Sequence, residues 1–124
     1  MIKYQRMNIG HAGENLACRY LKTHGYRIIQ QNYRIRGGEI DIVCHHHQTV
    51  VFVEVKTRQR LAQGPGRESI TRRKQGRLRA AAENFLMTYP DWYQAVRFDV
   101  IDIVWPTNQP PRVTHLQDCI QSDS

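Results

Sequence analysis

The feature that most constrains the fold of this 124-residue chain is an apolar segment, Ile40 to Lys56, that also carries charged residues. Its second half contains Val-Val-Phe-Val and one further valine, with almost no polar face, which is typical of a strand covered on both sides of a sheet. Buried carboxylate and ammonium groups are costly unless another group compensates their charge. The charged residues Asp41, Glu54 and Lys56 therefore need partners, and a bound divalent cation would compensate the two acids.

The overall composition suits one small domain. A length of 124 residues with 40% hydrophobic residues is enough for a single modest core. We expect a cytoplasmic protein without a membrane partner, because no apolar run reaches the length of a membrane span and the N-terminal residues lack a signal-peptide core. The three cysteines are widely spaced, which gives no indication of a disulfide scaffold or a thiolate zinc site.

The charge is positive and unevenly distributed. The formal net charge is +7, and the chain up to Arg67 holds eleven Lys or Arg residues but only four acids. A basic surface with a few concentrated carboxylates suits an enzyme that acts on nucleic acid, because cations contact phosphates and carboxylates hold metal. The alternative is a basic protein whose few acids are placed at random.

The hydrophobic pattern predicts an α/β fold with a mixed central β-sheet flanked by α-helices. The expected helices cover residues 8–24 and 69–89, and the expected strands cover residues 26–33, 39–44, 49–56, 96–105 and 112–116. The short link between the second and third strands requires an antiparallel hairpin, whereas the helical crossover after the third strand permits a parallel pair. We expect one domain over residues 1–117 and a polar, frayed tail over residues 118–124.

The predicted hairpin brings two acids together. With a turn at residues 47–48, residues whose numbers add up to 95 lie opposite each other, so Asp41 faces Glu54 and Glu39 faces Lys56. Directly opposed residues have Cβ atoms roughly 4.5–5.5 Å apart on one face of a sheet. Two carboxylates at that separation repel each other, and a cation between their oxygens removes the repulsion.

The two acids suit magnesium, with manganese as a substitute. Magnesium prefers oxygen ligands and commonly uses one or two carboxylates together with substrate phosphate. Glu14 lies on the apolar stripe of the first helix and is a candidate third ligand, for one metal ion or for a second. Lys56 points to the same side of its strand as Glu54 and can orient the attacking water or stabilise charge on the phosphate.

Each of these residues also has a purely structural interpretation. Glu14 can be an exposed acid in the first turn of a helix, where the helix dipole favours it. Asp41, Glu54 and Lys56 can form a cross-strand network of ion pairs without any metal. The three consecutive histidines after Cys44 are interpreted as the exposed tip of the hairpin, and Asp99 and Asp102 are expected on opposite faces of a later strand, outside the site.

Three motifs resemble the YraN family of small bacterial proteins, which are predicted to be endonucleases. They are GxxGE at Gly10 to Glu14, GEIDIV at Gly38 to Val43, and VFVEVKTR at Val51 to Arg58. The similarity continues through the second helix to about Val104. It implies the restriction-endonuclease-like PD-(D/E)xK fold, closest to archaeal Holliday-junction resolvases.

The resemblance also implies roles for four residues. Asp41 and Glu54 would be metal ligands, Lys56 would be the catalytic lysine, and Glu14 would be the helical acid of the resolvase-like subset. Ile40 stands where the PD-(D/E)xK signature places a proline. Many members of that superfamily lack this proline.

The function expected from these observations is metal-dependent hydrolysis of phosphodiester bonds in DNA, with branched or structured DNA as the substrate. Resolvase-like enzymes usually act as homodimers, so a homodimer is expected by analogy. The alternative is a nucleic-acid-binding or scaffold protein that keeps the fold without cleaving. The basic residues expected to contact nucleic acid are Arg34, Arg36, Arg58, Arg60, Arg72, Arg73, Lys74 and Arg77.

Overall fold

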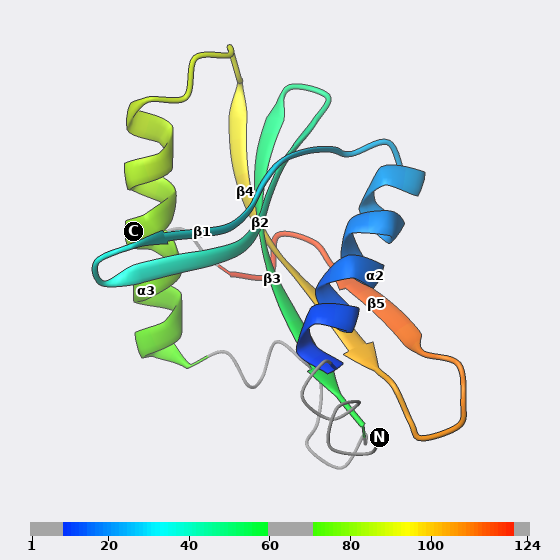
Figure 1. The fold of residues 1–124 in the computed structure, drawn as a ribbon. Coiled ribbons are helices and arrows are strands. Elements are labelled where there is room, and N and C mark those ends of the chain that lie inside the picture. The colour runs from blue at the N-terminus through cyan, green and yellow to red at the C-terminus, as the bar shows by residue number, and fades with distance from the viewer. Residues whose placement is uncertain (1–8, 60–70, 121–124) are drawn as a thin grey trace.

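A computed structural model describes residues 9–59 and 71–120 as a single five-stranded sheet with a helix on each face (Figure 1). The elements are α2 (Ile9–Thr23), β1 (Arg27–Ile35), β2 (Gly38–His46), β3 (Thr49–Arg58), α3 (Arg72–Met87), β4 (Ala95–Val104) and β5 (Arg112–Leu116). The predicted α/β fold with a mixed central sheet is confirmed, and it is consistent with a restriction-endonuclease-like architecture.

The strand order is β1-β2-β3-β4-β5, and every neighbouring pair is antiparallel except β3 and β4. The parallel pair is connected by the crossover that contains α3, as expected from the sequence. The β2–β3 turn consists of His47 and Gln48, with His47 in the left-handed region at a φ of 57°. All recorded β2–β3 pairs, from Ile42–Val53 to His46–Thr49, have numbers that add up to 95, so the predicted register is confirmed for these five pairs. The predicted pair of Asp41 with Glu54 is not among them, because the ladder ends one pair earlier.

The ends of the helices follow their local sequence. Gly25 adopts a φ of 88° and its N–H donates to the carbonyl of Lys22, which ends α2 as predicted. The second helix is shorter than the expected 69–89, because Thr71 is its N-cap and its hydroxyl accepts a hydrogen bond from the Lys74 N–H at 3.1 Å.

The sheet divides the core into two layers. On the α3 face, Phe52 and Phe98 pack with Leu78 and Phe85 of the helix. On the α2 face, the main buried residues are Leu21, Ile42, Val51, Val53 and Ile101. The central strand β3 is buried on both faces over residues 50–54, as its continuous apolar run predicts.

A glycine allows α3 to lie directly on β2. A Cβ atom at Gly38 would lie 2.5 Å from the backbone carbonyl oxygen of Arg77 and 3.1 Å from the backbone nitrogen of Ala81. Any larger residue at this position would therefore push the helix away from the strand. The distance between α3 and the start of β2 depends on this absence of a side chain.

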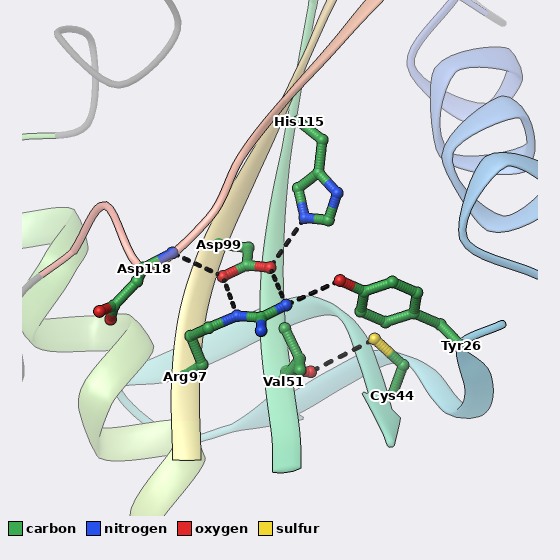
Figure 2. A network of polar contacts seen from close by, with 7 residues as sticks. All are labelled: Tyr26, Cys44, Val51, Arg97, Asp99, His115 and Asp118. Atoms are coloured by element: carbon green, nitrogen blue, oxygen red, sulfur yellow. Dashed lines mark hydrogen bonds and ion pairs between the residues drawn. The ribbon is translucent and has the colours of Figure 1, made fainter. Parts of the chain in front are cut away.

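A buried ionic network joins β4 to β5 on the α2 face (Figure 2). The Asp99 carboxylate is fully buried and accepts hydrogen bonds from Arg97 Nε and Nη2, both at 2.9 Å. His115 Nε2 lies 2.8 Å from the same carboxylate, and the Arg97 guanidinium also donates to the Tyr26 hydroxyl at 2.7 Å. Burial raises the pKa of Asp99, but the hydrogen bonds from His115 and Arg97 outweigh this effect, so the pKa lies below its usual range.

The same network fixes the start of the expected tail. The Asp118 N–H donates to Asp99 at 2.9 Å, the Cys119 N–H donates to the Phe98 carbonyl at 3.1 Å, and Ile120 is buried in the α3-face core. The prediction that the chain is frayed from residue 118 is therefore wrong for residues 118–120, since Ile120 supplies an apolar anchor. Residues 121–124 lie outside the described residues.

In the part of the chain that the structure describes, neither helix is long and apolar enough to span a membrane.

We predict that Gly38→Ala and Gly76→Ala have opposite effects on stability. Gly38→Ala should lower the free energy of unfolding by about 1–3 kcal/mol, because the added methyl group meets the α3 backbone. A Cβ at Gly76, inside α3, meets nothing within 4 Å, so Gly76→Ala should raise the free energy of unfolding by about 0.5–1 kcal/mol. Urea denaturation of both variants measures the difference. Equal effects would show that α3 does not lie this close to β2.

We predict that Asp99→Asn lowers the free energy of unfolding at neutral pH by about 3–5 kcal/mol, because Arg97 loses its buried partner. The pKa of Asp99 is lower in the folded protein than in the unfolded chain, so its contribution is present above the unfolded pKa and is lost as the pH falls through the folded pKa. Wild type should therefore lose more stability than the variant between pH 5 and strongly acidic pH. Parallel pH–stability curves for the two proteins would contradict this assignment.

Candidate active site at the fork between β2 and β3

The candidate site lies where β2 separates from β3. The β2–β3 pairing ends at Ile42–Val53, one pair before Asp41 and Glu54. Beyond that point the Val55 N–H donates to Asp41 Oδ2 at 2.8 Å, so a side-chain carboxylate replaces the backbone acceptor of a continuing ladder. The rest of β2 stays paired with β1, and this hairpin crosses toward α3 (Figure 1).

The acids at the fork repel each other. Glu54 is buried, with its side chain 8% exposed. The pKa of Asp41 is raised to about 7, first by burial and then by the negative charges of Glu54 and Glu14, while the Val55 hydrogen bond and the charge of Lys74 oppose the rise. The described residues thus leave the negative charge at the fork only partly compensated.

Glu14 reaches this region because α2 lies directly on β3. A Cβ atom at Gly13 would lie 2.0 Å from Thr57 Oγ1, so only glycine permits this contact. The next residue, Glu14, is half-buried, and its charge acts on Asp41. The helical pattern predicted Glu14 on the inner stripe of the helix but did not predict the close approach at Gly13, for which the glycine spacing of the GxxGE motif was the available signal.

Lys74 contacts Glu54 directly. It lies in the first turn of α3, and its Nζ is 2.9 Å from Glu54 Oε2. Burial lowers the pKa of Lys74, but the hydrogen bond and charge of Glu54 raise it more, so the pKa lies above its ordinary value. Lys74 was expected to contact nucleic acid, and its ion pair with Glu54 was not predicted from the sequence.

Lys56 has the orientation that its spacing predicts. It alternates with Val55, which packs on the α2 face, so Lys56 lies on the same face of β3 as Glu54. Among the described residues, its ammonium forms no salt bridge within 4 Å. The expected pairing of Lys56 with Glu39 is wrong, because the ladder ends before these residues and Glu39 forms an ion pair with Arg34 at 3.8 Å.

The basic residues expected to contact nucleic acid fall into three groups. Arg34, Arg36, Arg72 and Arg73 are exposed, whereas Lys74 and Arg77 are half-buried on α3. Arg58 is buried, with its side chain 8% exposed and its Nη2 3.0 Å from Asp102 Oδ2, so it leaves little surface for a phosphate. Arg58 is therefore not part of the exposed basic surface expected to contact nucleic acid. Arg60 lies outside the described residues.

The remaining polar candidates lie outside the fork. Asp99 and Asp102 occupy opposite faces of β4, and each forms an ion pair with an arginine. The histidines at the hairpin tip are less exposed than expected, because His46 stacks on Tyr26 with ring centroids 3.9 Å apart and His45 Nδ1 lies 2.6 Å from the Tyr89 hydroxyl.

The donor chemistry of the fork fits a magnesium ion, although its acids are not arranged as a complete set of ligands. Asp41 and Glu54 supply the carboxylate oxygens that magnesium prefers. A cation between them would oppose the burial and the negative charges that raise the pKa of Asp41. Within residues 9–59 and 71–120, no group of three or more His, Cys, Asp and Glu side chains is positioned to hold a metal. Two carboxylates suffice for magnesium when water and phosphate complete its shell.

Comparison with known proteins identifies the relatives of this chain. The profile of the Uncharacterised protein family UPF0102 matches residues 13–103, which include Glu14, Asp41, Glu54, Lys56 and Lys74. A UPF0102 protein of Clavibacter michiganensis is 40% identical over 88% of this chain and 92% of its own length. Another from Geobacter metallireducens is 40% identical over 92% and 93%, and one from Chlorobium phaeobacteroides is 46% identical over 77% and 76%. The chain therefore belongs to the UPF0102 family, which is the YraN family that its motifs resemble.

Proposed function

We propose that this protein is a divalent-metal-dependent endonuclease that hydrolyses phosphodiester bonds of DNA, with branched or structured DNA as its substrate. The observation that carries the proposal is the acid pair at the fork. Asp41 and Glu54 are brought together where two strands separate, burial and then the charge of Glu54 raise the pKa of Asp41 to about 7, and Lys56 follows Glu54 on the same face of β3. Burying two neighbouring carboxylates destabilises the fold, and features of this kind are expected at functional sites.

Asp41 and Glu54 would hold magnesium, with Glu14 as the third acid nearby. The bound cation supplies Lewis-acid stabilisation of the phosphate and lowers the pKa of a bound water. The Lys56 ammonium, which has no salt-bridge partner among the described residues, is available to stabilise negative charge on the scissile phosphate. In this role Lys56 acts through its positive charge.

The first turn of α3 would hold the flanking phosphates. Arg72 and Arg73 are exposed there, beside backbone N–H groups at the positive end of the helix dipole. Contacts of this kind read the path of the backbone and carry little base information, which suits recognition of DNA shape. A homodimer would allow two strands to be cut together.

A second candidate function is nucleic-acid binding without cleavage. The observation that favours it is the salt bridge between Lys74 and Glu54, which occupies one of the two proposed metal ligands. In that case the fork would be a structural ion-pair cluster next to a phosphate-binding helix terminus.

We predict that Glu54→Gln reduces cleavage of a four-way DNA junction in magnesium by roughly 100-fold or more, because the variant keeps the shape of the side chain but loses its charge. The affinity for the junction, measured in EDTA, should not fall below that of wild type, because Glu54 contacts metal and not DNA in this proposal. Glu83→Gln, at an exposed position of α3, is the matched control and should cleave like wild type. Failure of wild type to cleave any DNA form with magnesium or manganese would favour the binding module.

We predict that Arg72→Gln weakens DNA binding for all sequences and reduces the slope of log K against log salt by about 1 unit. The physical reason is the loss of one phosphate contact and of the counterion it releases. Arg112→Gln removes an exposed charge from the edge strand β5 and should leave the slope unchanged. Fluorescence anisotropy across a salt series measures both. Identical slopes for the two variants would place the nucleic-acid interface elsewhere.

A further inference from the structure

The first turn of α3 breaks a general rule of helix electrostatics. It contains Arg72, Arg73 and Lys74 and no acidic residue. The N-terminus of a helix carries partial positive charge, so cations there are unfavourable and acids are the usual residues. A local conflict of this kind is expected where function requires it. The two arginines are exposed, but Lys74 turns toward the acids of the fork.

Lys74 supplies the positive charge that the acid pair lacks. Its Nζ lies 2.9 Å from Glu54 Oε2, and its charge also lowers the pKa of Asp41. Within the described ranges, no other Lys or Arg forms a salt bridge with either acid. The two partners differ in exposure, because the Glu54 side chain is 8% exposed whereas the Lys74 side chain is 44% exposed.

We infer that Lys74 is an internal counter-ion that occupies Glu54 when no metal is bound, and that it must leave this carboxylate before the acid pair can ligate a divalent cation. The inference rests on the proposed function. An ammonium and a divalent ion on the same carboxylate repel each other, so the two states exclude one another. The step involves no covalent change; one salt bridge opens and Lys74 keeps its proton.

The geometry makes this exchange easy. The buried Glu54 carboxylate would be costly without a partner, but the arriving cation replaces Lys74 there. The Lys74 side chain is already partly exposed, so releasing its ammonium to water costs little. The flexible four-carbon stem of lysine lets the ammonium rotate out to solvent while α3 stays in place. The helix itself lies close to β2 because Gly38 has no side chain. Once released, Lys74 lies next to Arg72 and Arg73, where it adds a third cation for DNA phosphate. Binding of metal and binding of DNA should therefore strengthen each other.

The test is a manganese titration of the full-length protein, followed by electron paramagnetic resonance of free Mn²⁺, for wild type, Lys74→Gln and Arg79→Gln. Lys74→Gln should bind Mn²⁺ at least about fivefold more tightly than wild type, because the competing charge is gone. Arg79→Gln removes the same charge from the same helix and should stay within about twofold of wild type. Thermal unfolding establishes that all three proteins are folded.

Three outcomes are distinguishable. Tighter binding by Lys74→Gln alone supports the inference. Equal binding by all three proteins overturns it and leaves the proposed metal site standing, because Lys74 then does not compete for Glu54. Absence of Mn²⁺ binding in every protein, Lys74→Gln included, overturns both the inference and the proposed metal-dependent function.

A second measurement tests the release of Lys74 toward DNA. Anisotropy of a labelled four-way junction is followed with and without Mn²⁺ in a Lys56→Gln background, which suppresses cleavage. The gain in DNA affinity on adding Mn²⁺ should be about fivefold smaller when Lys74→Gln is also present. An unchanged gain would overturn the coupling between the two ligands.

Discussion

The hydrogen bond from the Val55 N–H to the Asp41 carboxylate is the interaction on which the candidate site depends. It lies directly beyond Ile42–Val53, the last pair of the β2–β3 ladder, and it holds the Asp41 carboxylate at the backbone of the central strand. Without this fork, Asp41 would be one more residue in a regular hairpin. With it, both helices have access to the acids, since α2 approaches from one face of the sheet and α3 from the other (Figure 1).

Two glycines make that access possible. Gly13 lets α2 touch Thr57 at the end of β3, and Gly38 lets α3 touch the start of β2. Each removes the side chain that would otherwise separate a helix from the sheet beside the fork. The charges that meet there, from Glu14 on α2 and Lys74 on α3, are delivered by these two close approaches. Away from the fork, the Asp99 network fixes β5 and the following residues to β4 (Figure 2).

Much of the fold could be predicted from the sequence because it rests on local rules. The two-residue turn and the alternation of buried residues determine the β2–β3 register, and Gly25 determines the end of α2. The contacts that complete the site depend on how the helices dock, which local patterns do not specify. The salt bridge of Lys74 with Glu54 is one example.

Two corrections have a similar origin. Arg58 was expected beyond the end of the third strand, among the residues that contact nucleic acid, but β3 continues to it, and its side chain turns inward to Asp102. Ile120 was overlooked inside a polar tail, although a single apolar residue is enough to anchor it. In both cases a short-range pattern was outweighed by a partner far away in the sequence.

The most direct test of the account is a crystal structure of the protein grown with manganese, examined by anomalous diffraction. The account predicts an anomalous peak within ligand distance of Asp41 and Glu54, with the Lys74 ammonium moved away from Glu54. A map with no such peak, in which Lys74 remains paired with Glu54, would contradict the central claim that this acid pair is a metal site.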